Sequence, residues 1–249
     1  MSLTLSLQGV RGGVGVTTLV AALGQALRAL GERVLLVEGS PDHLLGLHLG
    51  LSVAETRGWA RAQLDGTDWR DAAFQCAPGL ALLPYGAVGE ADVAAIEQAL
   101  QRTPRFWAER LPLLQAQFDW IVFDLPQRLS AHAATVNRQA CALPLLVATV
   151  DPGCHVLLHR HVDETRRLLP NRYDPALPLQ RDLMQLWSEA YGARLLPQPV
   201  HEDASVPAAL ARKLPLGLDA AGSLAAADAA GLALWCLAER GRLRGTPAA

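Results

Sequence analysis

The segment 12–18 combines glycine and threonine residues in the way expected of a loop that holds phosphate. Glycine lets the backbone turn tightly and come close to a ligand because it has no Cβ. The unpaired N–H groups of a helix that starts there would point at the anion. A threonine hydroxyl at position 17 can bind Mg²⁺, and one at position 18 can reach a phosphate oxygen. The predicted binding residues are Gly12, Gly13, Val14, Gly15, Val16, Thr17 and Thr18.

The elements on both sides of this loop also fit a phosphate site. Alternation of Leu3, Leu5 and Leu7 predicts a strand before it, and the alanine- and leucine-rich segment 19–30 predicts a helix after it. Strand, loop and helix match the phosphate-binding pattern G-x-x-x-x-G-K-[ST] except at Val16, where the pattern has lysine. An ordinary glycine-rich turn is the alternative, but the threonines and the flanking elements favour phosphate binding.

Two carboxylates end predicted strands. The apolar run 33–38 ends in Glu38, and the run 118–124, which is typical of a buried strand, ends in Asp124. Ligands of open α/β sheets bind beyond the carboxyl ends of the strands. Asp124 is therefore a candidate to hold Mg²⁺ beside the glycine loop, and helix capping is its alternative role.

Strand and helix patterns alternate along the rest of the chain, which predicts an α/β fold with a mostly parallel, doubly wound sheet in three αβα layers. No change in composition marks a second domain, so we expect a single domain over 1–249, with a core over 1–242 and a tail over 243–249. The remaining predictions are a helical excursion over 54–76, a strand over 80–84, a helix over 90–115 broken near Thr103-Pro104, a strand over 143–150, a helix ending near 168, a strand over 194–197 and a helix over 222–242.

Composition argues against several classes of protein. The 249 residues are 51% hydrophobic with a formal net charge of −2, so charge gives no reason to expect nucleic-acid binding. We find no secretion signal and no apolar run of the roughly 18 residues that a membrane span needs. Four widely spaced cysteines favour reduced cytoplasmic thiols over a disulfide framework. Cys154, His155 and His159 favour a plain helix over a metal site, because leucines lie among them.

The predicted helix near the C-terminus has two possible surroundings. Its leucines are followed by Arg240, Arg242 and Arg244, a combination that can anchor a helix at a membrane surface. The basic tail is short, however, and the apolar residues suit packing on the sheet equally well. We therefore favour packing.

The run Arg11-Gly-Gly-Val-Gly-Val-Thr-Thr resembles the deviant Walker A motif, K-G-G-x-G-K-[ST]-[ST], of the MinD/ParA family in the SIMIBI class of P-loop NTPases. The resemblance implies a P-loop NTPase fold that binds ATP and Mg²⁺ between two copies of the chain in a sandwich homodimer. It also implies that Arg11 reaches across the dimer interface to the nucleotide of the partner. The second basic residue of the motif is lost at Val16.

The turn after Glu38 resembles the D-x-D-P turn of the same family. The resemblance places Glu38 near the metal and puts Ser40 where the family has the aspartate that positions the attacking water. A serine hydroxyl can orient water but has no negative charge to attract its proton. Hydrolysis should therefore be slow unless Asp42 or a partner compensates, and an ordinary turn with Asp42 as a helix cap is the alternative.

Longer segments resemble the BcsQ family, the MinD-like proteins of bacterial cellulose synthase operons. The similarity includes Gly58-Trp-Ala-Arg, Asp68-Trp-Arg-Asp and Val150-Asp-Pro-Gly-Cys-His, and it extends over nearly the whole chain. It implies a cytoplasmic regulator of cellulose secretion, recruited to the inner-membrane synthase with small accessory proteins of the BcsR and BcsE kinds. The positions that adenine contacts in this family correspond here to Asn171, Pro199, His201 and Asp203.

Three functions are compatible with these residues. The first is a nucleotide-dependent switch with slow or absent hydrolysis, in which Arg11, Ser40 and Asp124 act on the phosphate end and Thr17, Glu38 and Asp124 surround the metal. The second is an active ATPase that cycles on and off the secretion system. The third is a nucleotide-free scaffold, supported by Val16. Loss of the loop lysine and of the water-positioning aspartate favours the switch.

Overall fold

The computed structural model describes residues 2–127, 131–161 and 165–245. Its centre is a seven-stranded sheet in the order β3-β4-β2-β5-β1-β6-β7, in which β3 pairs antiparallel with β4 and all other pairs are parallel. The predicted mostly parallel α/β fold is confirmed. The strands are β1 (Leu3–Gly9), β2 (Val34–Glu38), β3 (Phe74–Ala77), β4 (Leu80–Leu83), β5 (Trp120–Leu125), β6 (Leu143–Thr149) and β7 (Arg167–Asn171).

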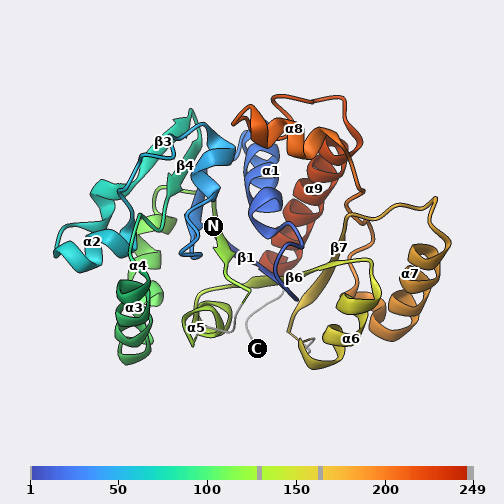
Figure 1. Ribbon diagram of the computed structural model, residues 1–249, viewed down its shortest axis with the longest axis horizontal. Helices are drawn as coiled ribbons and strands as arrows, with labels where there is room; N and C mark the ends of the chain where they lie inside the picture. The colour runs from blue at the N-terminus through green and yellow to red at the C-terminus, as the bar shows by residue number, and fades with distance from the viewer. Residues whose placement is uncertain (1, 128–130, 162–164, 246–249) are drawn as a thin grey trace.

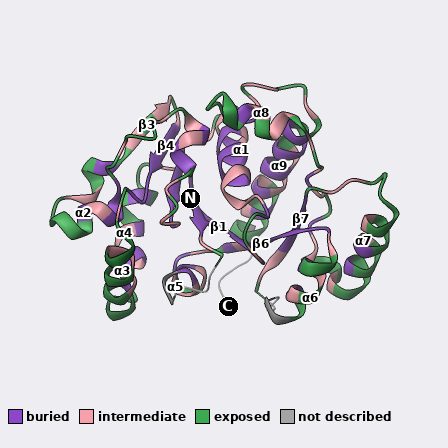
Figure 2. Ribbon diagram, in the orientation of Figure 1, coloured by how far each residue is buried: buried purple, intermediate pink, exposed green. Residues whose placement is uncertain are grey.

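Helices cover both faces of the sheet because its strands carry apolar side chains on both sides. On β2, Leu36 belongs to the core under α1 (Val16–Ala29), whereas Leu35 and Val37 belong to the core on the opposite face. Next to α1 lies α9 (Leu224–Gly245), as Figure 1 shows. The opposite face is covered by α3 (Glu90–Arg102), α4 (Phe106–Gln115) and α5 (Ala131–Gln139). Figure 2 shows buried strands between helices whose outer sides are exposed.

The remaining helices extend these two layers. Near the β6–β7 edge, α6 (Pro152–His161) and α7 (Pro178–Tyr191) contribute Cys154, Leu158 and Trp187 to the core. In Figure 1, α8 lies close to α1 and α9. These elements are α2 (Trp59–Asp65), α6 (Pro152–His161), α7 (Pro178–Tyr191), α8 (Ser205–Ala211) and the 3₁₀ turns η1 (Leu45–Leu49), η2 (Trp69–Ala72) and η3 (Gly192–Arg194).

Three expected elements differ from the structure. Part of the expected helical segment 54–76 is strand β3, which forms because β4 follows closely enough to pair with it as a hairpin. The helix expected to end near 168 is described only as far as His161, and β7 begins at Arg167, where it pairs with β6. The strand expected over 194–197 is only an isolated bridge between Leu168 and Leu195.

Other expectations agree with the structure. The predicted break near Thr103-Pro104 separates α3 from α4. Packing of α9 against α1 supports the interpretation of the last helix as a packed element. It continues to Gly245, beyond the expected core boundary at 242, and the end of the expected tail, 246–249, lies outside the described residues. Among the helices described, none has the length and apolar character that crossing a bilayer requires.

Candidate nucleotide-binding site

The glycine loop connects β1 to α1 and lies at the carboxyl end of β1, which is paired on both edges, with β5 and β6. Gly15, immediately before α1, has φ of 90°, in the left-handed region that favours glycine. A Cβ at this position would also lie 2.6 Å from Nδ2 of Asn171, which itself donates a 2.7 Å hydrogen bond to the carbonyl of Val14. The end of β7 therefore holds the loop in shape.

A cavity of about 360 Å³ opens beside this loop. It brings together the loop residues predicted from sequence, Ser40 and Asp42 of the turn after β2, and Asp124 near the end of β5. Its described lining is Arg11, Gly12, Gly13, Val14, Gly15, Val16, Thr17, Thr18, Ser40, Asp42, Leu44, Asp124, Leu125, Pro126 and Gln127. Polar and charged groups at one end of a glycine loop are what a polyphosphate requires.

Asp124 is a buried carboxylate without full compensation. It is 2% exposed, and its Oδ2 has no hydrogen-bond partner in the described part of the chain. Burial raises the pKa of Asp124 to about 7, although a hydrogen bond with Thr17 opposes the shift. Unpaired buried carboxylates are costly, and a divalent cation would supply the missing charge. Thr17 and Asp124 thus fit a Mg²⁺ ion chemically.

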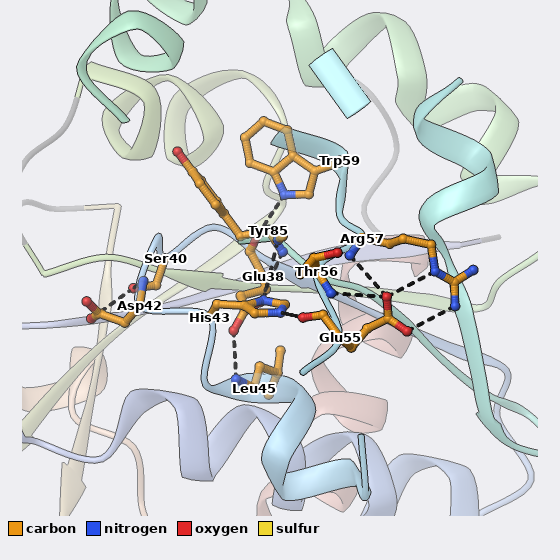
Figure 3. A network of polar contacts seen from close by, with 11 residues as sticks. Glu38, Ser40, Asp42, His43, Leu45, Glu55, Thr56, Arg57, Trp59 and Tyr85 are labelled. Carbon is orange, nitrogen blue, oxygen red and sulfur yellow. Dashed lines mark hydrogen bonds and ion pairs between the residues drawn. The ribbon is translucent and has the colours of Figure 1, made fainter. Parts of the chain in front are cut away.

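Glu38 has a different environment from the one expected of a metal ligand. Its carboxylate is fully buried, and it is not among the described residues that line the cavity. Figure 3 shows the side chain surrounded by protein donors. Oε1 accepts a hydrogen bond from the N–H of Leu45 at 2.6 Å, and Oε2 accepts one from Tyr85 N–H at 3.0 Å and pairs with His43 Nδ1 at 2.9 Å. This arrangement supports the turn that follows β2 rather than leaving oxygens for a metal.

Ser40 and Asp42 both lie at the cavity, as shown at the edge of the network in Figure 3. The hydroxyl of Ser40 is 3.2 Å from Oδ2 of Asp42 and can donate to it. A carboxylate that accepts a hydrogen bond from the hydroxyl increases the electron density on the hydroxyl oxygen. The pair can therefore orient a water molecule better than serine alone. Sequence reasoning identified both residues but not their contact.

Arg11 is held within its own chain. Its guanidinium donates to Oδ2 of Asp151 at 2.8 Å and to the hydroxyl of Thr149 at 3.2 Å, and its side chain is 40% exposed. Burial of Asp151 is outweighed by hydrogen bonds from Thr149, the N–H of Cys154 and Arg11, which hold the pKa of Asp151 down to about 2. In the sequence analysis Asp151 appears only within the segment Val150-Asp-Pro-Gly-Cys-His, and its pairing with Arg11 was not predicted.

A second cavity of about 290 Å³ shares Gly13, Gly15 and Thr18 with the first. The two cavities therefore meet at the glycine loop, an arrangement suited to a base on one side and phosphates on the other. Most of its walls are apolar, and sequence reasoning missed them because their residues come from distant helices. The described lining adds Leu19, Ala22, Asn171, Arg172, Val200, His201, Glu202, Asp203, Val206, Pro207, Leu210, Leu216, Ala225 and Ala229.

The four residues expected at adenine have different surroundings. Asn171, His201 and Asp203 line the second cavity, whereas Pro199 is not among its described lining residues. The carboxylate of Asp203 accepts from the N–H groups of Ser205 and Ala225, so it joins the start of α8 to the start of α9. His201 Nδ1 and its backbone N–H both contact the buried carboxylate of Asp228 at 2.8 Å.

The chain matches the family described as "Cellulose biosynthesis protein BcsQ" over residues 1–237. It is 38% identical over 246 residues to the cellulose biosynthesis protein BcsQ of Escherichia coli K12, covering 94% of this chain and 93% of that protein. Identity to the protein of the same name from Salmonella typhimurium is 39% over 246 residues, with the same coverage.

Solved structures with a similar fold are more distant in sequence. A ParA family ATPase from Chlorobium tepidum has a TM-score of 0.75 at 17% identity, covering 94% of this chain and 99% of that one. The septum site-determining protein MinD from Pyrococcus horikoshii, solved with Mg-ADP, has a TM-score of 0.72 at 22% identity and covers 98% of both chains. These similarities establish the MinD/ParA P-loop NTPase fold.

Proposed function

The chain belongs to the BcsQ family of cellulose biosynthesis proteins, and we propose that it is an ATP-binding, dimerising switch of the cellulose synthesis and secretion machinery. ATP and Mg²⁺ bind between two copies of the chain. The assembled dimer, rather than the product of hydrolysis, is the form that partner proteins recognise.

The observation that carries this proposal is the uncompensated carboxylate of Asp124 at a cavity that the glycine loop also lines. A protein without a ligand here gains nothing from burying this oxygen, since an unpaired buried polar group lowers stability. A cation with a polyphosphate would satisfy Asp124 and the free N–H groups of the loop together.

Each part of the site has a role in this proposal. The backbone of residues 12–18 holds phosphate, and Thr17 with Asp124 holds Mg²⁺, which supplies positive charge against the phosphates when bound. Arg11 releases Asp151 and instead binds the terminal phosphate of the nucleotide held by the partner. Asn171, His201 and the apolar walls of the second cavity hold the base. Glu38 supports the neighbouring turn.

Hydrolysis is slow or absent because two charges that assist it are missing. Val16 brings no positive charge to the phosphates, and the Ser40 hydroxyl has no charge of its own to activate water. Binding energy is therefore used for association rather than for turnover.

The setting of this switch follows from its relatives. We place it in the cytoplasm as a single domain that is recruited to the inner-membrane cellulose synthase, with accessory proteins of the BcsR and BcsE kinds as partners. The cellulose biosynthesis relatives support this role. A net charge of −2 supports the exclusion of nucleic acid as a partner.

Calorimetric titration with ATP and Mg²⁺, followed by light scattering of the same samples, tests the proposal. We expect binding and a shift from monomer to dimer, both lost in Asp124→Ala. In Arg11→Ala we expect weaker dimerisation. An Arg11→Ala protein that binds ATP and dimerises as well as the unchanged protein contradicts the role of Arg11, and absence of any binding by the unchanged protein favours a nucleotide-free scaffold.

A cycling ATPase is the second candidate, and the contact between Ser40 and Asp42 favours it. A steady-state phosphate-release assay separates it from the switch. Turnover well above background that is lost in both Asp124→Ala and Asp42→Asn supports the cycling enzyme, whereas binding without turnover supports the switch.

A further inference from the structure

The turn after β2 contains a histidine in a conformation that histidine seldom adopts. His43 has φ of 52°, in the left-handed region, where non-glycine residues are uncommon. Such a conformation costs free energy and persists only where the surroundings hold it. Here the surroundings are contacts on both sides of the ring, so these contacts rather than backbone preference keep His43 in place (Figure 3).

Both ring nitrogens of His43 contact hydrogen-bond acceptors. Nδ1 is 2.9 Å from Oε2 of Glu38, and Nε2 is 3.1 Å from the carbonyl oxygen of Glu55. The N–H of Gly86 also lies 3.4 Å from Nδ1, a long and weak contact beside the one with Glu38. The hydrogen bond with Glu38 raises the pKa of His43, which favours the imidazolium form with a hydrogen on each nitrogen. Glu38 also accepts from two backbone N–H groups, as expected of an ionised carboxylate. His43 and Glu38 form a largely enclosed ion pair.

This ion pair is fixed to the body of the protein from several directions. Glu38 accepts hydrogen bonds from the backbone of Leu45 and Tyr85, and its carbonyl oxygen accepts one from the indole N–H of Trp59 at 2.7 Å. Trp59 is fully buried. The position of His43 is thus determined by β2, by the end of β4 and by the start of α2.

The residues on either side of His43 line the phosphate cavity. Asp42 and Leu44 are its direct neighbours, and Ser40 lies three residues earlier. The two cavities share Gly13, Gly15 and Thr18, and the Ser40 turn lines only the cavity away from the base pocket. With the base in the second cavity, this turn would therefore lie at the end of the nucleotide that carries the last phosphate.

We propose that His43 is a positioning residue, which anchors the turn 40–44 on Glu38 so that Ser40 and Asp42 face the terminal phosphate of the bound nucleotide. This inference rests on the proposed function. It predicts that His43 contributes to the preference for a nucleoside triphosphate over a diphosphate, because the turn meets only the terminal phosphate. A histidine that served only the stability of the fold would affect both nucleotides equally.

The test compares three variants by calorimetric titration with Mg²⁺ and either a non-hydrolysable ATP analogue or ADP. His43→Gly removes the ring while allowing the left-handed backbone. His43→Asn also tolerates that backbone and keeps one side-chain donor for Glu38. Lys213→Gly is the matched control, since Lys213 is a second non-glycine residue with positive φ, at 56°, and is exposed and absent from both described cavity linings.

In His43→Gly we expect affinity for the ATP analogue to fall by about tenfold and affinity for ADP by less than about twofold. His43→Asn should show a smaller loss for the analogue, and Lys213→Gly should match the unchanged protein for both ligands. Equal losses for both nucleotides in His43→Gly, or no loss for either, overturn the role of His43. Should the unchanged protein bind neither nucleotide, the proposed function itself fails, which is a distinct result. If His43→Gly does not fold, the triphosphate-to-diphosphate affinity ratio of His43→Asn decides the question, and an unchanged ratio contradicts the proposal.

Discussion

Two buried carboxylates lie next to each other where β2 and β5 end, and they differ in their partners. Glu38 and Asp124 are paired in the register of these strands. Glu38 has two backbone donors and an imidazolium, whereas Asp124 has one unpartnered oxygen among the described residues. Proximity of Glu38 also raises the pKa of Asp124, after the larger effect of burial. Carboxylates at the same edge of the sheet therefore differ in role: Glu38 supports the structure, whereas Asp124 keeps an oxygen that a ligand can use.

Asp124→Asn should change how stability depends on pH in the ligand-free protein. The pKa of Asp124 is about 7 in the folded chain, above its value in the unfolded chain, so its favourable contribution is complete below about pH 4 and is lost as pH rises through 7. Since asparagine cannot ionise, the variant should be more stable than the unchanged protein at pH 8, by roughly 2–4 kcal/mol, and similar at pH 4. Thermal unfolding at both pH values measures this.

Addition of ATP and Mg²⁺ at pH 8 gives the matching control, because bound ligand should raise the unfolding temperature of the unchanged protein and not that of Asp124→Asn. A variant that is less stable than the unchanged protein at pH 8 without ligand contradicts the uncompensated charge.

Asp151→Asn should strengthen ATP binding. The change removes the charge that competes with phosphate for Arg11, while asparagine can still accept the hydrogen bond that Asp151 receives from the N–H of Cys154. We expect an increase in affinity of about two- to fivefold, as for loss of a partly exposed ion pair. Titration calorimetry measures it. Asp119→Asn is the control, since Asp119 pairs with Arg33 at an exposed position far from both cavities, and an equal effect there contradicts this mechanism.

The sequence predicted which residue types gather at the site but not how their hydrogen bonds are distributed. Residues of the glycine loop and Asp124 could be predicted because each follows a strand, and the parallel strands bring their carboxyl ends together. Nothing local distinguishes Glu38 from Asp124, since the donors to Glu38 come from the turn after β2 and from the end of β4. The role of Asp151 could not be predicted for the same reason, because its partner Arg11 lies in another loop.

At the scale of elements, the segment between β2 and α3 depends on one close approach of two backbones. Gly58 comes directly before α2, and a Cβ there would lie 2.1 Å from the N of Gly86 and 2.2 Å from the carbonyl carbon of Tyr85. The backbone of Trp59 donates to the carbonyl of Pro84 across the same contact. No side chain fits between these two backbone segments, so their close contact fixes the position of α2 relative to the sheet.

Gly58→Ala should therefore destabilise the protein by about 3 kcal/mol or more, since backbone rather than a flexible side chain must move. Urea unfolding measures the change. Gly222→Ala is the matched control, because its Cβ would have no described atom within 4 Å and its φ is not in the left-handed region. We expect a change within about 0.5 kcal/mol there. Equal stability of Gly58→Ala and the unchanged protein would contradict the claim that this backbone contact leaves no room for a side chain.

Helices and strands were predicted correctly where the sequence pattern of the segment itself determines its structure. Prediction failed where pairing with another segment of the chain determines it. The buried strand ending in Asp124 and the break at Thr103-Pro104 are local in origin. Strand β3 forms only because β4 offers a pairing edge. The segment 195–197 forms no strand although its residues are apolar, because it makes only one described bridge to β7. Neighbours in space, absent from a sequence window, determine both outcomes.

At the scale of the whole molecule, the described residues form two large hydrophobic cores on opposite faces of one sheet, together with a smaller cluster between α1, α8 and α9. Trp59 and Trp107 lie in one core, and Trp120 and Trp187 lie in the other. Adjacent residues of β5 divide between the cores, with Val122 on one side and Phe123 on the other. Both cores pack on the same strands, so unfolding of the sheet would expose both of them to water. This shared dependence supports our proposal of a single domain.

Unfolding in urea should therefore be one cooperative transition. Tryptophan fluorescence reports on both cores, and far-ultraviolet circular dichroism reports on the helices, so the two curves should have the same midpoint. ATP with Mg²⁺ should move both curves together to higher urea. Two separate midpoints without ligand would show that the cores unfold independently and would contradict the single-domain proposal.

The interior position of β1, between β5 and β6, has a consequence for biosynthesis. Its neighbours in the sheet begin at Trp120 and Leu143, so the first strand made by the ribosome waits for its partners while most of the chain is synthesised. At about 5–20 residues per second, completion of β6 follows β1 by roughly 7–30 s. Until β5 is complete, both edges of β1 lack their native pairing, and the edge that pairs with β6 lacks it to the end of this interval. Unpaired strand edges favour aggregation, so the nascent chain is exposed to it before the site can hold a ligand.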